Sequence, residues 1–245
     1  MELRIYFGIV YVFLGLIILI FLINHTRIRD LFLSESGRLL SNGGCVYINL
    51  ENREDRKKNI LKVMDSLEIP TEKINKVSGV YIPKNGHKGC VQAHILALQI
   101  AKMNKWDHIL ILEDDAKLNC NENEIQSKLK LVNDFITSNK WDIFMLSAAF
   151  KKSSETDHDN IVKIQSASTS TAYIVNNTYY DTLLKTFINC NNNMLSSRWE
   201  KDGWESFALD QQWKPLQKEH LWFALNEDLL KQDFSGSTIM QHTSR

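Results

Sequence analysis

The longest hydrophobic run of the chain lies at its N-terminus, where the 19 residues from Ile5 to Ile23 carry no charged side chain. As an α-helix at about 1.5 Å per residue, this run would span roughly 28 Å, close to the hydrocarbon thickness of a bilayer. It lacks the polar stripe of a buried soluble helix, and no A-x-A cleavage pattern of a secretory signal follows it. The pattern predicts an N-terminal tail over residues 1–4 and one transmembrane helix over residues 5–23.

The charges beside this segment leave its orientation open. Arg4 and the amino terminus precede it and Arg27 and Arg29 follow it, so the positive-inside rule is nearly balanced. An Asn-x-Thr sequon at Asn176 favours a lumenal side for the rest of the chain, although such triplets also arise by chance. We expect a single-pass membrane protein of type II, facing the Golgi or endoplasmic reticulum lumen in a eukaryotic or viral setting and otherwise held in a bacterial inner membrane.

Beyond this segment, short apolar runs alternate with helical spacing. Residues 24–43 mix charged residues, serine and glycine and predict a stem, so the globular domain is expected over residues 44–245. Strands are expected at Cys45–Leu50, Ile109–Leu112, Ile143–Leu146 and Ala172–Val175, and helices at Arg53–Leu67, Val91–Met103 and Glu124–Ser138. The polar segments Lys151–Asn160 and Asn189–Asn193 are expected to be loops. This alternation predicts an α/β fold, with a mostly parallel sheet and flanking helices.

The composition is that of a folded, neutral protein. The chain has 245 residues, 29 Lys and Arg against 29 Asp and Glu, and 44% hydrophobic residues, which excludes disordered and low-complexity classes. A formal charge of zero argues against a nucleic-acid partner, because such proteins need a basic excess or stripe. The four cysteines lack CxxC spacing, so neither a disulfide scaffold nor a structural zinc site is predicted.

Candidate chemistry appears where the apolar run Ile109–Leu112, typical of a central parallel strand, stops at Glu113, Asp114 and Asp115. In open α/β sheets, ligands bind beyond the carboxyl ends of strands, and adjacent carboxylates at such a place require a cation. Oxygen ligands suit Mn²⁺ or Mg²⁺. If the strand continues, Glu113 and Asp115 point the same way, about 6.6 Å apart, and Asp114 points the other way. The alternative is a solvated acidic turn.

Several further blocks occur in a recognisable order. They are Tyr47–Leu50 with Arg53, Asp55 and Arg56; Ile74–Gly79; Gly89 and Cys90 with His94; Ile111–Asp115; Trp141–Ile143; Thr171–Ile174; Asp210 with Trp213; and Gln232 with Ser235. Together they resemble glycosyltransferase family 25, which includes lipooligosaccharide and procollagen galactosyltransferases, over about residues 44–240. Two departures are Ala93, in place of the family's usual serine, and the missing proline shortly before Gln232.

The resemblance implies a GT-A-like, Rossmann-like fold and a metal-assisted transfer from a UDP-sugar, with inversion at the anomeric carbon. It implies Asp115, and then Glu113, as ligands of Mn²⁺ or Mg²⁺. The residues implied in donor binding are Asn49, Leu50, Arg53, Arg56, Glu113, Asp114, Gln232 and Ser235. For Arg53 and Arg56, which can pair with phosphate, the alternative is a solvated first helical turn. For Gln232 and Ser235 the alternative is a purely structural role at the end of the fold.

The resemblance also implies an acceptor side. Asp210 is implied as the general base that takes the proton of the acceptor hydroxyl, although Asp202 and Glu205 lie close in sequence and one surface helix could carry all three. His94 and Trp213 are implied as acceptor contacts. For both, a place in the core is the competing interpretation, because His94 shares a helical face with apolar residues and tryptophan rings fill cores.

The expected function is a membrane-anchored glycosyltransferase that moves a hexose, galactose or glucose, onto a hydroxyl of a glycan or protein acceptor. A non-catalytic glycan-binding or adhesion module with the same fold is the alternative, which the two departures from the family pattern motivate. Glycoside hydrolysis ranks lower, since adjacent carboxylates on one strand cannot flank a glycosidic bond from two sides.

Overall fold

The computed structural model describes residues 40, 42–83, 85–194 and 204–234. The expected N-terminal tail, the transmembrane helix, most of the stem and Ser235 lie outside the described residues. Within the described ranges, no helix is long and apolar enough to cross a membrane. The anchor and the domain boundaries therefore stay predictions.

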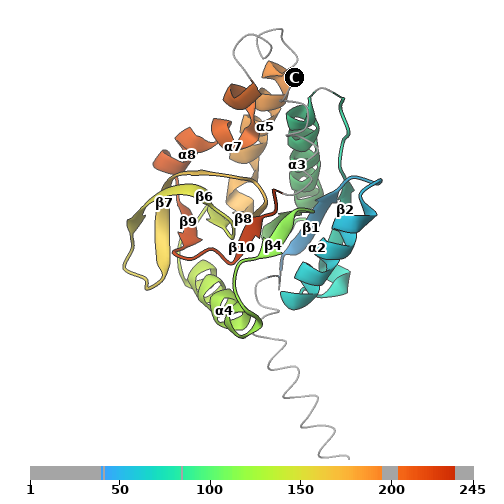
Figure 1. The fold of residues 1–245 in the computed structure, drawn as a ribbon. Coiled ribbons are helices and arrows are strands. Elements are labelled where there is room, and N and C mark those ends of the chain that lie inside the picture. The colour runs from blue at the N-terminus through green and yellow to red at the C-terminus, as the bar shows by residue number, and fades with distance from the viewer. Residues whose placement is uncertain (1–39, 41, 84, 195–203, 235–245) are drawn as a thin grey trace, which may run out of the picture.

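Eight strands form one mixed sheet in the order β2-β1-β3-β8-β5-β9-β7-β6 (Figure 1). Their bounds are β1 Gly44–Asn49, β2 Ile74–Ser78, β3 His108–Glu113, β5 Ile143–Met145, β6 Ala149–Glu155, β7 Ile161–Ser168, β8 Ala172–Asn176 and β9 Trp222–Leu225. Parallel pairing joins β1 to β2, β1 to β3 and β5 to β9, whereas β8 and β7 run antiparallel to both of their neighbours. Six of the eight strands point the same way, which confirms an α/β fold with a mostly parallel sheet.

A second, two-stranded sheet pairs β4 (Ala116–Leu118) with β10 (Leu230–Gln232) in antiparallel register. β4 follows β3 after a turn at Asp114 and Asp115, and Gln232 is the register partner of Ala116. The C-terminal strand of the described chain therefore lies directly beside the turn that carries these two aspartates.

Helices cover both faces of the large sheet (Figure 1). They are α2 Glu54–Ser66, α3 Gly86–Met103, α4 Glu122–Ser138, α5 Tyr180–Asn193, α7 Leu209–Gln212 and α8 Lys214–Glu219, with 3₁₀ turns η2 Thr71–Lys73, η3 Asn177–Tyr179 and η4 Trp204–Phe207. Strand β3 contributes to two cores because its side chains alternate between the faces. Ile109 and Ile111 pack with residues of α3 and α5, whereas Leu110 and Leu112 pack with residues of α2 and α4.

The prediction of loops over residues 151–160 and 189–193 is correct only for residues 156–160, which lie between β6 and β7. The first segment contains most of β6, an edge strand whose side chains are largely exposed, so no hydrophobic alternation marks it. The second is the end of α5, where buried Cys190 continues the apolar face that includes Phe187. The prediction of a central parallel strand at Ile109–Leu112 is correct on one side only, because β3 is parallel to β1 and antiparallel to β8.

Helix α3 begins at Gly86, earlier than its apolar spacing predicts, because the Asn85 side chain caps the first turn by accepting a backbone N–H hydrogen bond (3.1 Å). Gly89 in this turn allows a very close approach. A Cβ there would lie 1.9 Å from the carbonyl oxygen of Val80, so no other residue fits without displacing the backbone. The segment after β2 is thereby packed directly against α3.

Candidate active site

The acidic triplet lies at the carboxyl end of β3, where the sequence predicts a ligand site. Glu113 is the last residue of β3, and Asp114 and Asp115 form the turn that leads into β4. Each of the two aspartates is only 8% exposed, so the alternative of a solvated acidic turn is wrong. Buried carboxylates need compensating partners, and for the two aspartates three neighbouring segments supply them.

One guanidinium, that of Arg56 on α2, faces both aspartates. Its Nη1 lies 2.9 Å from Asp114 Oδ1 and 3.7 Å from Asp115 Oδ2. Asn49, at the end of β1, donates from its side-chain amide to Asp114 Oδ2 (2.8 Å). Gln232, in β10, donates to Asp115 Oδ2 (3.2 Å). Five residues that the resemblance assigns to the donor and metal are thus brought together by β1, α2, the turn after β3, and β10.

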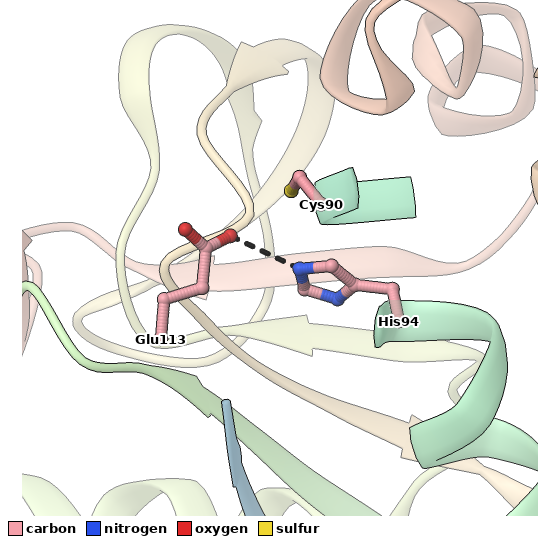
Figure 2. A group of neighbouring side chains, drawn as sticks. All are labelled: Cys90, His94 and Glu113. Carbon is pink, nitrogen blue, oxygen red and sulfur yellow. Dashed lines mark hydrogen bonds and ion pairs between the residues drawn. The ribbon is translucent and has the colours of Figure 1, made fainter. Parts of the chain in front are cut away.

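The Glu113 carboxylate has a different set of partners. Its Oε1 lies 3.1 Å from His94 Nε2 (Figure 2) and accepts a hydrogen bond from Ser170 Oγ. The other ring nitrogen of His94, Nδ1, lies 2.7 Å from the hydroxyl of Tyr173. His94 thus links the carboxylate to the Tyr173 hydroxyl. Burial acts to raise the pKa of Glu113, but the hydrogen bond from His94, the charge interaction with His94 and the hydrogen bond from Ser170 together hold the pKa below its usual value.

The prediction that Glu113 and Asp115 share one side, with Asp114 on the other, is wrong. β3 ends at Glu113 and the backbone turns at Asp114, so strand alternation does not extend across the triplet. Asp114 and Asp115 face Arg56 together, while Glu113 faces His94. His94 itself is fully buried and is bonded to two side chains, so it lies in the core and at the edge of the site at once.

These residues border one cleft with an empty volume of about 770 Å³, part of it open to solvent. The lining residues that the resemblance singles out are Asn49, Leu50, Arg56, His94, Glu113, Asp114, Asp115 and Gln232. The segment after β2 adds an apolar part to the lining with Val80, Tyr81 and Ile82, and Tyr81 is 60% exposed. Apolar walls with a few charged groups are typical of a cleft that binds a small molecule.

Arg53 is not among the residues that border this cleft. Its guanidinium pairs with Asp55 at 2.9 and 3.0 Å, and it borders a smaller pocket of about 360 Å³. Arg56, Asp114 and Asp115 border both pockets. Of the two arginines, Arg56 is therefore the one placed to meet a ligand in the large cleft.

Trp213, just after α7, is fully buried and packs edge-on against Tyr173 and Trp222. The structure places it in the core, away from any acceptor surface, as the competing interpretation has it. Asp210, on α7, is not among the cleft-lining residues either, but its Oδ2 accepts a hydrogen bond from the backbone N–H of Thr169 (3.1 Å). Because Thr169 also bonds Gln232, one residue connects Asp210 to the site.

Sequence reasoning misses three residues that hold the site together. Thr169 contacts Asp210, Ser170 donates to Glu113, and Tyr173 bonds His94. The signal for the first two is a run of small hydroxyl residues and alanine, Ser166–Thr171, directly before the buried strand β8. Hydroxyl groups at the end of a strand can donate to neighbouring carboxylates, but the run alone does not say which carboxylates.

Asp115 is the residue that best fits a metal ion. Its Oδ1 is buried and has no hydrogen-bond partner among the described residues. Burial, together with the negative charge of Glu113, raises the pKa of Asp115 to about 7. A divalent cation at this oxygen would supply the missing partner and favour the ionised form, so the residues present fit Mn²⁺ or Mg²⁺.

A second group of possible ligands, Cys90, His94 and Glu113, has donor atoms within 4.8 Å of one another (Figure 2). Both ring nitrogens of His94 already lie at hydrogen-bond distance from protein groups. Burial, and then the charges of Glu113, Asp210 and Asp115, raise the pKa of Cys90 well above its usual value, which disfavours the thiolate when no metal is bound. Unlike the atoms of this group, Asp115 Oδ1 is a buried oxygen that has no partner among the described residues.

Comparisons with known proteins leave the family open. No protein-family model matches the sequence, and no curated protein matches it. The chain is similar to the structure of a mannose-1-phosphate geranyltransferase from Thermus thermophilus (TM-score 0.47, 9% identity, 82% of this chain and 79% of that chain). It is also similar to a glycosyltransferase involved in the glycosylation of the major capsid of PBCV-1 (TM-score 0.47, 10% identity, 81% of this chain and 97% of that chain). A third similar structure is that of a 4-diphosphocytidyl-2C-methyl-D-erythritol synthase from Anaerococcus prevotii (TM-score 0.35, 8% identity, 83% of this chain and 95% of that chain). At these TM-scores neither a family nor an activity follows, and the resemblance to family 25 stays a prediction.

Proposed function

We propose that this chain is a metal-dependent, inverting glycosyltransferase that moves a hexose, galactose or glucose, from a UDP-sugar to a hydroxyl of a glycan or protein acceptor. The observation that carries the proposal is Asp115, a buried carboxylate with one oxygen that has no partner among the described residues, at the edge of the cleft. It lies at the carboxyl end of a central strand, which is where open α/β sheets bind ligands.

Asp115 would hold Mn²⁺ or Mg²⁺, with Glu113 as a second candidate ligand. When bound, such an ion neutralises the charge that develops on a departing diphosphate. Arg56 lies beside the same carboxylates and its planar guanidinium can donate to phosphate oxygens. A cation and an arginine at one end of the cleft favour a ligand whose central part is a pyrophosphate.

Asn49 supports a polar contact to the donor. Its side-chain nitrogen donates to the carbonyl oxygen of Arg53 (3.1 Å) and to Asp114 (2.8 Å). Both partners only accept, so the orientation of the amide is fixed and its oxygen is left as an acceptor. That oxygen is buried and has no partner among the described residues. A ribose hydroxyl or a uracil N–H would satisfy it, and Leu50 and Tyr81 border the same cleft, where they would pack against the nucleoside.

Asp210 is the proposed general base. In an inverting displacement the acceptor oxygen forms a bond to the anomeric carbon, the bond from that carbon to the phosphate oxygen breaks, and UDP leaves with the electron pair. One carboxylate takes the proton of the attacking hydroxyl. Asp210 is half-buried and is held by the Thr169 backbone, so it is a fixed carboxylate connected to the donor side.

Turnover of UDP-sugars by the full-length protein in detergent tests the proposal. With UDP-galactose, UDP-glucose and simple acceptors, we expect hydrolysis or transfer that requires Mn²⁺ and stops with a chelator. Asp115→Asn should lower kcat/KM by on the order of 100-fold or more, as for the loss of a main electrostatic contact. Asp134→Asn, which changes an exposed carboxylate on α4 paired with Lys130, should have no effect.

Two results would contradict the proposed glycosyltransferase activity. One is the absence of both hydrolysis and transfer over the whole donor panel, and the other is an Asp115→Asn variant that is as active as the wild type. Glycan binding that a chelator leaves unchanged would then support the non-catalytic module instead.

The proposal includes the predicted N-terminal anchor and a type II orientation. Asn176, whose side chain accepts hydrogen bonds from the amide and hydroxyl of Thr178, reports on the side of the membrane. In a eukaryotic host we expect a glycosidase-sensitive mass shift that Asn176→Gln removes. An unshifted protein whose domain is digested by protease added to the cytosolic side would contradict the orientation.

A further inference from the structure

Thr169, between β7 and β8, has a backbone angle φ of 74°. This is the left-handed region, which a β-branched residue rarely adopts. The residue is also buried, at 7% exposure. Strain of this kind persists only where the surroundings fix it, and it concentrates at functional sites.

The contacts of Thr169 join two parts of the candidate site. Its backbone N–H donates to Asp210 Oδ2 (3.1 Å), and its hydroxyl donates to Gln232 Oε1 (3.2 Å). The Thr169 Oγ1 also lies 2.8 Å from Thr171 Oγ1. Because the only hydroxyl proton of Thr169 goes to Gln232, Thr171 is the donor in this last pair. Both ends of Thr169 are thus used, one toward the proposed base and one toward β10.

The Gln232 amide is held at both of its ends. With Oε1 held by the Thr169 hydroxyl, Nε2 is turned to Asp115 Oδ2 (3.2 Å). A reversed amide would set its oxygen against the carboxylate, which cannot donate when it is ionised. The carboxylate therefore sets which end of the amide faces it, and the Thr169 hydroxyl holds the other end in place. The second oxygen of Asp115, Oδ1, has no partner among the described residues.

We propose that Thr169 is a positioning residue, which orients Gln232 so that Asp115 presents one oxygen to a divalent cation and which holds Asp210 through its backbone. The inference rests on the proposed function, because it assigns the cation to Asp115 and the base to Asp210. It separates two effects: the hydroxyl of Thr169 acts on the metal, while its N–H acts on Asp210. A change to the side chain alone should therefore alter metal affinity and the KM for the donor more than kcat.

Two substitutions separate the hydroxyl from the shape of the side chain. Thr169→Val keeps the branched shape and removes the hydroxyl, whereas Thr169→Ser keeps the hydroxyl. Titration calorimetry of Mn²⁺ into the metal-free, full-length protein in detergent should show binding weakened about fivefold to tenfold in Thr169→Val, the size expected for one neutral hydrogen bond. Thr169→Ser should lie within about twofold of the wild type. Thr186→Val, which removes a hydroxyl bonded within α5, is the matched control and should bind Mn²⁺ like the wild type.

Gln232→Leu breaks the same link from the other side and leaves the strained position unchanged. It should weaken Mn²⁺ binding by a similar factor, and Thr169→Val should add nothing further in that background. This variant also keeps the inference testable if Thr169→Val does not fold.

The outcomes distinguish this inference from the proposed function. Suppose that the wild type binds Mn²⁺ and turns over a donor, and that Thr169→Val and Gln232→Leu both bind Mn²⁺ with the wild-type affinity. This result would overturn the role of Thr169 and leave the proposed function intact. A loss of affinity in Thr169→Ser as large as in Thr169→Val would also overturn it, because the effect would then follow packing and not the hydroxyl. A wild-type protein that neither binds Mn²⁺ nor turns over any UDP-sugar would overturn both.

Discussion

The burial of Asp115 predicts that the metal-free protein loses stability as the pH rises toward neutrality. The pKa of this carboxyl is raised from 3.8 to about 7, first by burial and then by the charge of Glu113. Between these two values the folded protein holds a proton that the unfolded chain has released. The contribution of Asp115 to stability is therefore fully present below about pH 4 and is lost as the pH rises through 7.

The size of this effect follows from the pKa. At 1.36 kcal/mol for each pH unit, a rise from 3.8 to about 7 corresponds to a loss of about 4 kcal/mol. Roughly 3 kcal/mol of it falls between pH 5 and pH 8, the range in which the comparison is practical. A cation bound at Asp115 favours the ionised carboxylate, so saturating Mn²⁺ should remove most of this dependence.

Equilibrium unfolding in urea measures the effect. The full-length protein in detergent with a chelator should have a free energy of unfolding that falls between pH 5 and pH 8, and Asp115→Asn should show a smaller fall by roughly 3 kcal/mol. Other titratable groups are common to both proteins, so the difference reports on Asp115 and on its interaction with Glu113. Asp134→Asn, at an exposed carboxylate, should keep the wild-type dependence. An Asp115→Asn variant with the same pH dependence as the wild type would refute the reasoning.

Two further predictions concern the residues that shape the cleft. Arg56→Met should lower the free energy of unfolding by about 3–5 kcal/mol, because two buried carboxylates lose their guanidinium partner. Arg53→Met should lower it by at most about 1 kcal/mol, because the side chain of its partner Asp55 is 64% exposed. Equal losses of stability for the two variants in urea would contradict this. Gly89→Ala should lower it by about 1–3 kcal/mol, because the new Cβ would meet the carbonyl oxygen of Val80 at 1.9 Å. Unchanged unfolding in urea would show that α3 is not pressed against the segment after β2.

The hydrophobic pattern predicts the centre of the fold well because the central elements are buried on both sides. Ile109–Leu112 is apolar throughout, and its side chains divide between the two cores. The pattern fails at β6, which is held by backbone pairing to β7 and exposes most of its side chains. The hydrophobic pattern also does not give the direction of a strand, so the antiparallel pairing of β8 with β3 could not be predicted from it.

The candidate site is predictable in part for related reasons. The resemblance names Asn49, Arg56 and Gln232, and the structure brings all three to the aspartates. It also names Trp213, which lies in the core, because a tryptophan in a sequence does not reveal which way its ring faces. The orientation of Glu113 could not be predicted, since it depends on a turn in the backbone and on His94, 19 residues earlier in the chain.

Two buried oxygens without partners among the described residues, Asn49 Oδ1 and Asp115 Oδ1, distinguish this site from an ordinary internal ion-pair cluster. An unsatisfied buried acceptor is costly, and folded proteins rarely retain one without a reason. A cluster that served stability alone would be closed by its own donors. Here Gln232 and Arg56 both approach Oδ2 of Asp115 and leave Oδ1 unpaired. That arrangement is expected of a site that a ligand completes, with a cation at the carboxylate and a hydroxyl or N–H group at the amide.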